Sequence, residues 1–195
     1  MSAHIFSDLP NVGAWRLLGA YDGFEMTHFT TTTKGVTLKG TSIGVEEGVP
    51  WHITYNIELD DSWHVQRATI TGINDTRLTI QKQDARWLIN GVHQPNLDGC
   101  VDLDLEASAV TNTIPMHRLA LNVGQKGASR AAYVRTHTLA VEVLDQTYHR
   151  LDDEDGKLVF DYHSPRFDYR DTLYFAADGL VLDYPSIAAR VQVKA

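Results

Sequence analysis

The stretch WHITYNIELD, residues 51–60, decides the fold class of this chain. Its apolar positions are Trp51, Ile53, Tyr55, Ile57 and Leu59, and they alternate with His52, Thr54, Asn56, Glu58 and Asp60. Because side chains alternate between the two faces of a strand, this pattern predicts an antiparallel strand with one buried and one solvated face.

Shorter runs of the same kind lie on both sides of this strand, separated by turn signals such as Asn90-Gly91 and Asp178-Gly179. The strand-like runs are residues 36–40, 77–82, 86–89, 158–162, 169–175 and 180–184, while 139–149 fits either a strand or a short helix. Long capped helical patterns and linker-like segments are missing from the sequence. We therefore expect a single all-β domain over residues 1–195, a barrel, sandwich or roll with little helix, in which residues 1–11 form a loose lead-in.

Composition narrows the class of function. The 195 residues carry a net charge of −8, with 43% hydrophobic and 22% charged side chains. This balance argues against nucleic acid and against an anionic membrane surface as partners. We expect no secretory signal, no membrane-spanning helix and a cytoplasmic location, and the single cysteine, Cys100, fits a reducing compartment. The oligomeric state stays open.

The most informative stretch for function is LDGCVDLDLEASAVTNTIPMHRLAL, residues 97–121. Its first part reads as a strand whose polar face carries Asp98, Cys100, Asp102, Asp104 and Glu106. A Thr-Asn-Thr-Ile-Pro turn follows, and we expect the chain to leave as a second strand through His117 and Arg118. Four carboxylates on one face repel one another unless cations, hydrogen-bond donors or water neutralise them.

Three interpretations of these carboxylates stay open: internal pairing with Arg or Lys, which we favour, ligand binding, and a metal or catalytic site. The calcium-loop pattern, the zinc-ligand spacings and the nucleophile-elbow motif are all missing from the sequence, and Cys100 is expected to be a small buried side chain. Asn112, His117 and Arg118 either satisfy the loop backbone or donate hydrogen bonds to a polar head group.

Aromatic side chains suggest a cavity. Tryptophans and tyrosines fall mostly on the expected strands, where they supply core packing or line a pocket for an amphipathic ligand. Arg67, in line with Trp63 on its strand, either extends along apolar surface or is held by a carboxylate.

A set of motifs resembles a family of bacterial proteins named for glycolipid binding. They are Gly99-Cys100-Val101-Asp102-Leu103-Asp104, Thr111-Asn112-Thr113-Ile114-Pro115 with Arg118-Leu119, Gln146-Thr147-Tyr148, Tyr162-His163-Ser164 and Ala177-Asp178-Gly179-Leu180-Val181-Leu182-Asp183-Tyr184-Pro185. The chain departs from the family pattern at His117, where a second arginine is usual, at Ala109-Val110, where Pro-Phe is usual, and at Ala177, where an acidic residue is usual.

The resemblance implies a spiral β-roll of many antiparallel strands with an interior groove, and a role in binding glycolipid or a similar amphiphile. It implies no established enzyme activity, and we expect no cofactor and no metal. The ligand-binding candidates are Trp63, Arg67, Trp87, Asp102, Asp104, Asn112, His117, Arg118, Tyr148, Tyr162 and Tyr184.

Two alternatives remain open from the residues. One is a hydrolase or lyase that uses Asp102 or Asp104 with His117 as acid and base. The other is a structural or interaction module in which Arg67, Arg118 and the acidic strand form a buried network.

Overall fold

In the computed structural model, which describes residues 6–193, the strand predicted over residues 51–60 is β4 (Val49–Leu59), and its apolar side chains point inward as expected. Five 3₁₀ turns, one short helix and fourteen further strands complete the described chain. The other strands are β1 Val12–Leu17, β2 Gly23–Thr32, β3 Gly35–Glu46, β5 Val65–Thr71, β6 Arg77–Gln83, β7 Arg86–Ile89, β8 Val92–His93, β9 Asp102–Leu105, β10 Lys126–Val134, β11 Val141–Arg150, β12 Leu158–Ser164, β13 Tyr169–Phe175, β14 Val181–Tyr184 and β15 Ala188–Val191. The helical elements are η1 Gly19–Tyr21, η2 Ile73–Asp75, η3 Pro95–Leu97, η4 Val110–Asn112, α1 Thr113–Leu119 and η5 Pro165–Phe167.

All fifteen strands belong to one sheet, in the order β8-β7-β6-β5-β4-β3-β2-β1-β15-β14-β13-β12-β11-β10-β9. The first eight strands form one antiparallel meander and β10 to β15 form another, and the two meanders meet where β1 pairs with β15. Among the strands of residues 6–193, only β9 is parallel to its neighbour, β10. The prediction of a mainly β fold with little helix is confirmed, and the strands form one open sheet. The spiral form of the roll stays a prediction.

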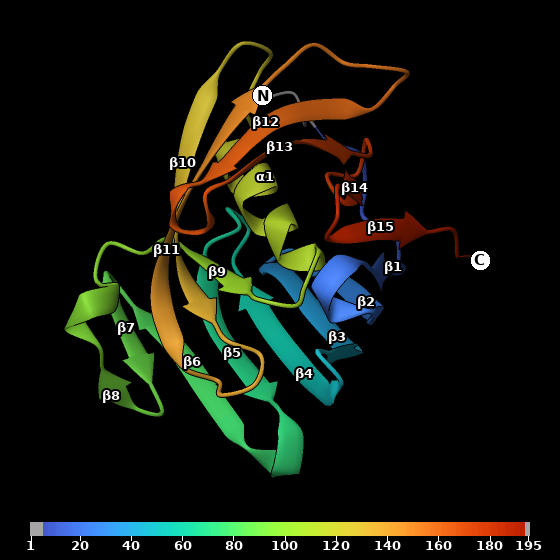
Figure 1. Ribbon diagram of the computed structural model, residues 1–195. Helices are drawn as coiled ribbons and strands as arrows, with labels where there is room; N and C mark the ends of the chain where they lie inside the picture. Colours follow the sequence, from blue (N-terminus) through green and yellow to red (C-terminus); the bar gives the residue numbers. More distant parts are fainter. Residues whose placement is uncertain (1–5, 194–195) are drawn as a thin grey trace.

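The sheet curls so that its two edge strands approach each other without pairing. Eight residues separate β8 from β9, and such a connection spans about 30 Å at most when fully extended. Trp87 of β7 holds this connection by donating from its indole nitrogen to the Cys100 carbonyl oxygen at 2.9 Å. Figure 1 shows the meander of β1 to β8 and that of β10 to β15 as two walls, with α1 between them.

The segment 97–121 lies between these walls and corrects one expectation. The second strand expected through His117 and Arg118 is instead the helix α1, which follows η4 directly. Pro115 falls within the first turn of α1, where a missing N–H is tolerated, and Ala120 ends the helix in the left-handed conformation (φ 45°). The polar face of β9 is also less exposed than expected: Asp102 is buried and Asp104 is only partly accessible.

The helix α1 separates two hydrophobic cores. Ile114 packs into the larger core, which is centred on β1, β3, β4, β5 and β9, whereas Met116 packs into a smaller core under β11 to β14. Positions two apart on a helix are separated by about 200° around its axis, so the two side chains point to different sides. Segment 97–121 is therefore the element that organises the interior.

The strand expected from Trp63 begins two residues later. Trp63 adopts a left-handed backbone (φ 65°) in the turn before β5, and Asp60 Oδ1 accepts hydrogen bonds from the N–H groups of Ser62 and His64. Residues 6–11 lie in no strand or helix, and the first five residues of the expected lead-in fall outside the described range. Within residues 6–193, no helix has the length and apolar character needed to cross a membrane.

Candidate functional site

A pocket of about 280 Å³ opens on the inner side of the β10–β14 wall, beside the segment 104–112. Six aromatic side chains line it: Tyr21, Tyr133, Tyr162, Phe167, Tyr169 and Tyr184. Four polar side chains of the segment that crosses the interior join them: Asp104, Glu106, Ser108 and Asn112. We call this cavity the tyrosine pocket.

Three tyrosines form a continuous aromatic wall. The ring centroids of Tyr162, Tyr169 and Tyr184 lie 5.7–6.0 Å from one another, at steep interplanar angles. The two pairs made by Tyr184 are edge-to-face, an arrangement that aromatic rings prefer, and the Tyr162–Tyr169 pair is tilted. The Tyr169 hydroxyl donates to the Pro185 carbonyl oxygen at 2.9 Å, which fixes the ring at the pocket. Tyr133 and Phe167 form a second aromatic pair, with centroids 5.7 Å apart.

Asp104 places a carboxylate among these rings. Its oxygens accept hydrogen bonds from Thr111 Oγ1 at 2.7 Å and from Gln146 Nε2 at 2.9 Å. Desolvation raises the pKa of Asp104 from 3.8 to about 6, although both hydrogen bonds act in the opposite direction. Gln146 also donates to the Tyr162 hydroxyl at 2.9 Å. Asp104 is thus held by neutral donors only, at a wall of the pocket.

The parallel pairing of β9 explains why Asp104 reaches the pocket. Tyr133 of β10 lies opposite Asp104 in the register, and Ala131 lies opposite Asp102. Side chains at positions two apart share one face of a strand. Asp102 and Asp104 therefore point to the same side, but only Asp104 lines the cavity.

Asp102 is neutralised by a cation from α1. Arg118 Nε and Nη2 donate to its two oxygens at 2.7 and 2.6 Å, and Ser129 Oγ donates to one of them at 2.6 Å. Such a two-point pair is the strongest geometry for an arginine and a carboxylate. The expectation of internal pairing is confirmed for Asp102.

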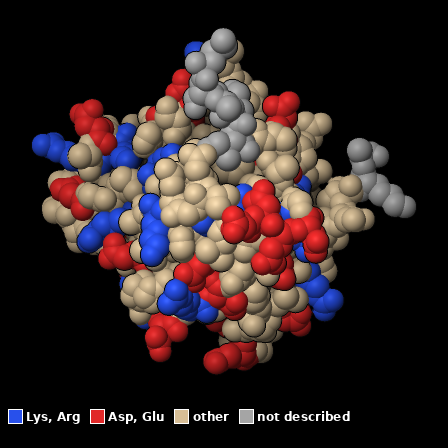
Figure 2. All heavy atoms as spheres, turned by 90° about the horizontal axis from the view of Figure 1, so that it is seen from above, with Lys and Arg blue, Asp and Glu red and all other residues tan. Residues whose placement is uncertain are grey.

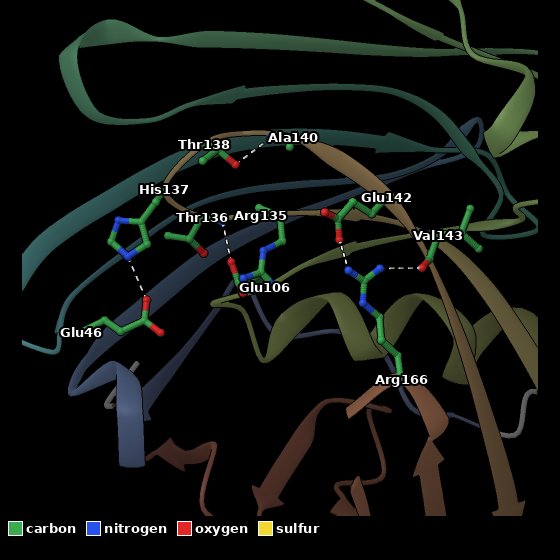
Figure 3. Close-up of polar contacts among 10 residues, drawn as sticks. All are labelled: Glu46, Glu106, Arg135, Thr136, His137, Thr138, Ala140, Glu142, Val143 and Arg166. Atoms are coloured by element: carbon green, nitrogen blue, oxygen red, sulfur yellow. Dashed lines mark hydrogen bonds and ion pairs between the residues drawn. The ribbon is translucent and has the colours of Figure 1, made fainter. Parts of the chain in front are cut away.

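Glu106 is also paired, at the edge of the tyrosine pocket. Arg135 Nη1 lies 2.7 Å from Glu106 Oε1, and the N–H of Thr136 donates to Oε2 at 2.8 Å. Two further pairs lie nearby in Figure 3: His137 with Glu46, and Arg166 with Glu142. Each arginine in Figure 3 is therefore engaged by a carboxylate of the protein itself.

Two further polar groups contribute to the pocket wall. Asn112 Oδ1 accepts a hydrogen bond from the Tyr148 hydroxyl at 3.1 Å. Ser164 is 1% exposed, lines the pocket, and its hydroxyl is without a hydrogen-bond partner among the described residues. A buried hydroxyl without a partner is costly, which makes Ser164 a ready partner for a ligand atom.

A buried glutamate outside the pocket anchors its wall. Glu25 of β2 accepts hydrogen bonds from the Tyr55 and Ser108 hydroxyls and from the N–H groups of Ala109 and Val110. These N–H groups begin η4, where a carboxylate satisfies donors that the helix leaves unpaired. Since Ser108 and Asn112 lie on either side of these N–H groups, Glu25 positions this part of the pocket.

The structure brings together some of the predicted ligand-binding residues. Asp104, Asn112, Tyr162 and Tyr184 line the tyrosine pocket. Tyr148, Asp102 and Arg118 lie directly behind it, through the hydrogen bonds of Tyr148 to Asn112 and of Arg118 to Asp102.

The other four predicted residues lie elsewhere. Trp63 stacks on His117 with ring centroids 3.8 Å apart, and Phe6 covers the other part of that imidazole. Trp87 is buried in the larger core. Arg67 is exposed on the outer face of β5, because Ala68 and Ile70 take the inward positions after a register shift between Glu58 and Leu59.

The acid–base set expected for a hydrolase or lyase is not assembled in the tyrosine pocket. His117 Nε2 contacts the Asp178 carbonyl oxygen at 3.0 Å, and burial lowers the pKa of His117 to about 4. Asp102 is occupied by Arg118. Among residues 6–193, no three His, Cys, Asp or Glu side chains come together as metal ligands.

Eleven of the fifteen lining residues were not among the predicted candidates. The aromatic and polar ones are Tyr21, Glu106, Ser108, Tyr133, Ser164, Phe167 and Tyr169. Tyr133 and Tyr169 lie on strands, where the alternation of side chains between the two faces could have indicated the direction in which each ring points. Tyr21 and Phe167 lie in 3₁₀ turns, where no periodic pattern indicates the direction of a side chain.

Comparison with known proteins shows which proteins the chain resembles in structure and in sequence. A DUF1089 family protein from Pseudomonas aeruginosa, known from its crystal structure, resembles the chain with a TM-score of 0.70 and 25% sequence identity, over 86% of this chain and 92% of that one. No curated protein matches the chain closely enough to indicate a relationship. The sequence model of the family described as "Putative glycolipid-binding" matches residues 13–190, from β1 to β15. This chain therefore belongs to that glycolipid-binding family.

Proposed function

We propose that this protein binds an amphipathic small molecule with a glycosylated head group, which sits in the tyrosine pocket, and that it does so without chemical conversion. The observation that carries this proposal is the lining itself, six aromatic rings beside the polar side chains of Asp104, Glu106, Ser108 and Asn112. Rings offer apolar faces to the C–H surface of a sugar, and carboxylate and amide groups hydrogen-bond its hydroxyls.

The size of the pocket supports binding of the head group alone. A volume of about 280 Å³ lies just below the range of small-molecule sites, which span roughly 300–1,000 Å³. This leaves room for about one ring, so the apolar tail would extend past Leu105, Leu144 and Ile187, which supply the aliphatic part of the lining. The name of the family supports the same class of ligand.

A binding role also fits the charge placement better than catalysis does. General acid–base catalysis needs two titratable groups within reach of one substrate atom. Asp104 lines the pocket, whereas the imidazole of His117 lies between Trp63 and Phe6 and contacts the Asp178 carbonyl. We place the protein in the cytoplasm, where its lone thiol would stay reduced.

A pocket-filling variant tests the proposal. Ala20 is exposed and lines the pocket, so Ala20→Trp should block the cavity with little effect on the core. The matched control is Ala85→Trp, in the exposed turn between β6 and β7. Calorimetric titration with octyl glycosides below their micelle concentration should show binding to wild type and Ala85→Trp, and loss of at least about tenfold in affinity for Ala20→Trp.

Native mass spectrometry of the purified protein, followed by lipid extraction, provides the second measurement. We expect a bound amphiphile with wild type and with Ala85→Trp, and none with Ala20→Trp. If octyl glycosides fail to bind wild type, or bind Ala20→Trp equally well, the proposed function is wrong.

A further inference from the structure

We infer that the head group accepted by the tyrosine pocket carries an ammonium group, which pairs with the Asp104 carboxylate against the surrounding tyrosine rings. The inference rests on the proposed function, since it names the chemistry of the ligand for that same pocket. Its support comes from charge pairing, from the composition of the lining and from the field of Asp104.

The first observation is that Asp104 has no cationic partner among the described residues. The three acidic side chains at positions 102, 104 and 106 differ in this respect. Asp102 is paired with Arg118 and Glu106 with Arg135, whereas Asp104 is held only by Thr111 and Gln146. A buried charge is most stable when an opposite charge meets it, and at Asp104 a ligand can supply that charge.

The second observation is that the lining attracts cations and repels anions. Of its fifteen residues, two are acidic and none is lysine or arginine. The nearby guanidinium groups of Arg135 and Arg166 are engaged by Glu106 and Glu142. A phosphate or carboxylate head group would thus lie beside Asp104 with no free arginine or lysine in the described lining to neutralise it.

The third observation is the number of ring faces around the same carboxylate. Tyr133, Tyr162, Tyr169 and Tyr184 line the cavity with Asp104, and aromatic rings attract cations through the negative potential of their faces. Tyrosine rings beside a carboxylate form the kind of cage that recognises organic ammonium groups. Hydroxyl groups of a sugar would use the same rings for stacking, so the ammonium adds specificity to the proposed binding.

The field of Asp104 extends through the site. It contributes to raising the pKa of five tyrosines, namely Tyr21, Tyr133, Tyr148, Tyr162 and Tyr184. The titratable and charged groups that face Asp104 are these tyrosines, Asp102 with Arg118, and Glu106 with Arg135. Within each of the two ion pairs the positive and the negative charge cancel. Asp104 is therefore the dominant charge of the pocket.

Three probes of equal tail length test the inference at pH 7. They are octyl 2-amino-2-deoxy-β-glucoside with an ammonium, octyl β-glucoside with a hydroxyl of similar size at that position, and octyl β-glucuronide with a carboxylate. We expect the ammonium probe to bind wild type at least about tenfold more tightly than the hydroxyl probe, the factor that corresponds to one unit of pKa change in Asp104. The carboxylate probe should bind most weakly.

Two variants locate the effect. In Asp104→Asn, the affinities for the ammonium and hydroxyl probes should agree within about twofold, because the amide carries no charge. In the control Asp145→Asn, which removes an exposed carboxylate of β11, the preference should stay at the wild-type level. Lowering the pH through about 6 should weaken the ammonium probe alone, since Asp104 then becomes protonated.

The possible outcomes distinguish a failure of the ammonium inference from a failure of the proposed binding function. Equal affinities of wild type for the ammonium and hydroxyl probes would overturn the inference and leave the proposed function standing. Binding of none of the three probes would overturn both. The comparison of probes on wild type decides the matter even if Asp104→Asn fails to fold.

Discussion

Glu25 and Asp104 are both carboxylates in the interior, and neither meets a cation among the described residues, yet their surroundings differ. Four donors fill the oxygens of Glu25, two of them backbone N–H groups of the chain that crosses the interior. Asp104 has two side-chain donors and a cavity beside it. A fully satisfied carboxylate fixes a segment in place, whereas a partly satisfied one at a cavity retains the capacity to bind.

Removing Glu25 should have the largest effect on stability. Glu25→Ala leaves two hydroxyls and two N–H groups without their acceptor in a closed environment. We expect a loss of about 4–6 kcal/mol in the free energy of unfolding, measured by urea denaturation. Glu58→Ala on the solvated face of β4 is the control. A loss below about 1 kcal/mol would contradict the role of Glu25 as an anchor.

The ion pair of Asp102 with Arg118 extends the comparison to a buried carboxylate that does have a cationic partner. Arg118→Met leaves Asp102 buried without its cation and should cost about 3–5 kcal/mol in urea denaturation. The double variant Asp102→Leu/Arg118→Met removes both charges and should recover half of that loss or more. If the double variant is no more stable than the single one, the destabilisation comes from lost packing rather than from an unpaired charge.

Asp104 should make stability depend on pH with a defined sign. Its folded pKa of about 6 exceeds the ordinary value of 3.8, so the folded state binds the proton more tightly. The resulting stabilisation is complete below pH 3.8 and is lost as the pH rises through 6. Relative to Asp104→Asn, wild type should gain about 2 kcal/mol in the free energy of unfolding between pH 7 and pH 4, because the unfolded carboxyl is only partly protonated at pH 4. A constant difference across that range would show that Asp104 titrates as in the unfolded chain.

His117 gives the opposite sign and the smallest effect near neutral pH. Burial lowers its pKa to about 4, so its contribution to stability is complete above 6.5 and is lost as the pH falls through 4. The imidazole resonances in an NMR titration should show a midpoint near pH 4, with a stability change below about 1 kcal/mol between pH 7.5 and 6.

Trp63→Leu supplies the control for His117. Because the indole ring stacks on the imidazole, its removal should hydrate His117 and move the NMR midpoint upward, toward 6.5. A wild-type midpoint already near 6.5 would mean that His117 is accessible to water.

The sequence predicted the strands well and the structure of segment 97–121 only in part. Alternation identified β4, and Asn90-Gly91 gave the hairpin of β7 and β8, because these signals are local. The helix α1 was expected to be a strand, since its seven residues are too few for the pattern of apolar positions to distinguish the two periods. Arg118 was a correct candidate for a polar contact, but only the helix shows that its partner is Asp102.

The pocket was predictable to the extent that its residues lie on one strand or in one motif. Asp104, Asn112 and Tyr162 were found in this way. Tyr21 reaches the pocket because β1 pairs with β15, and Tyr133 because β9 runs parallel to β10. These are contacts between segments far apart in the chain, and no local propensity encodes them.

The pairing of β1 with β15 also sets an order of events during synthesis. β1 ends at Leu17 and its partner β15 begins at Ala188, so at about 5–20 residues per second the edge of β1 waits roughly ten to thirty seconds for its neighbour. The β1–β8 meander can form from local hairpins during that interval, with the edge of β1 still unpaired. Nascent chains are therefore most prone to aggregate before the last strand emerges from the ribosome, and the seam should be the slowest part of the sheet to form.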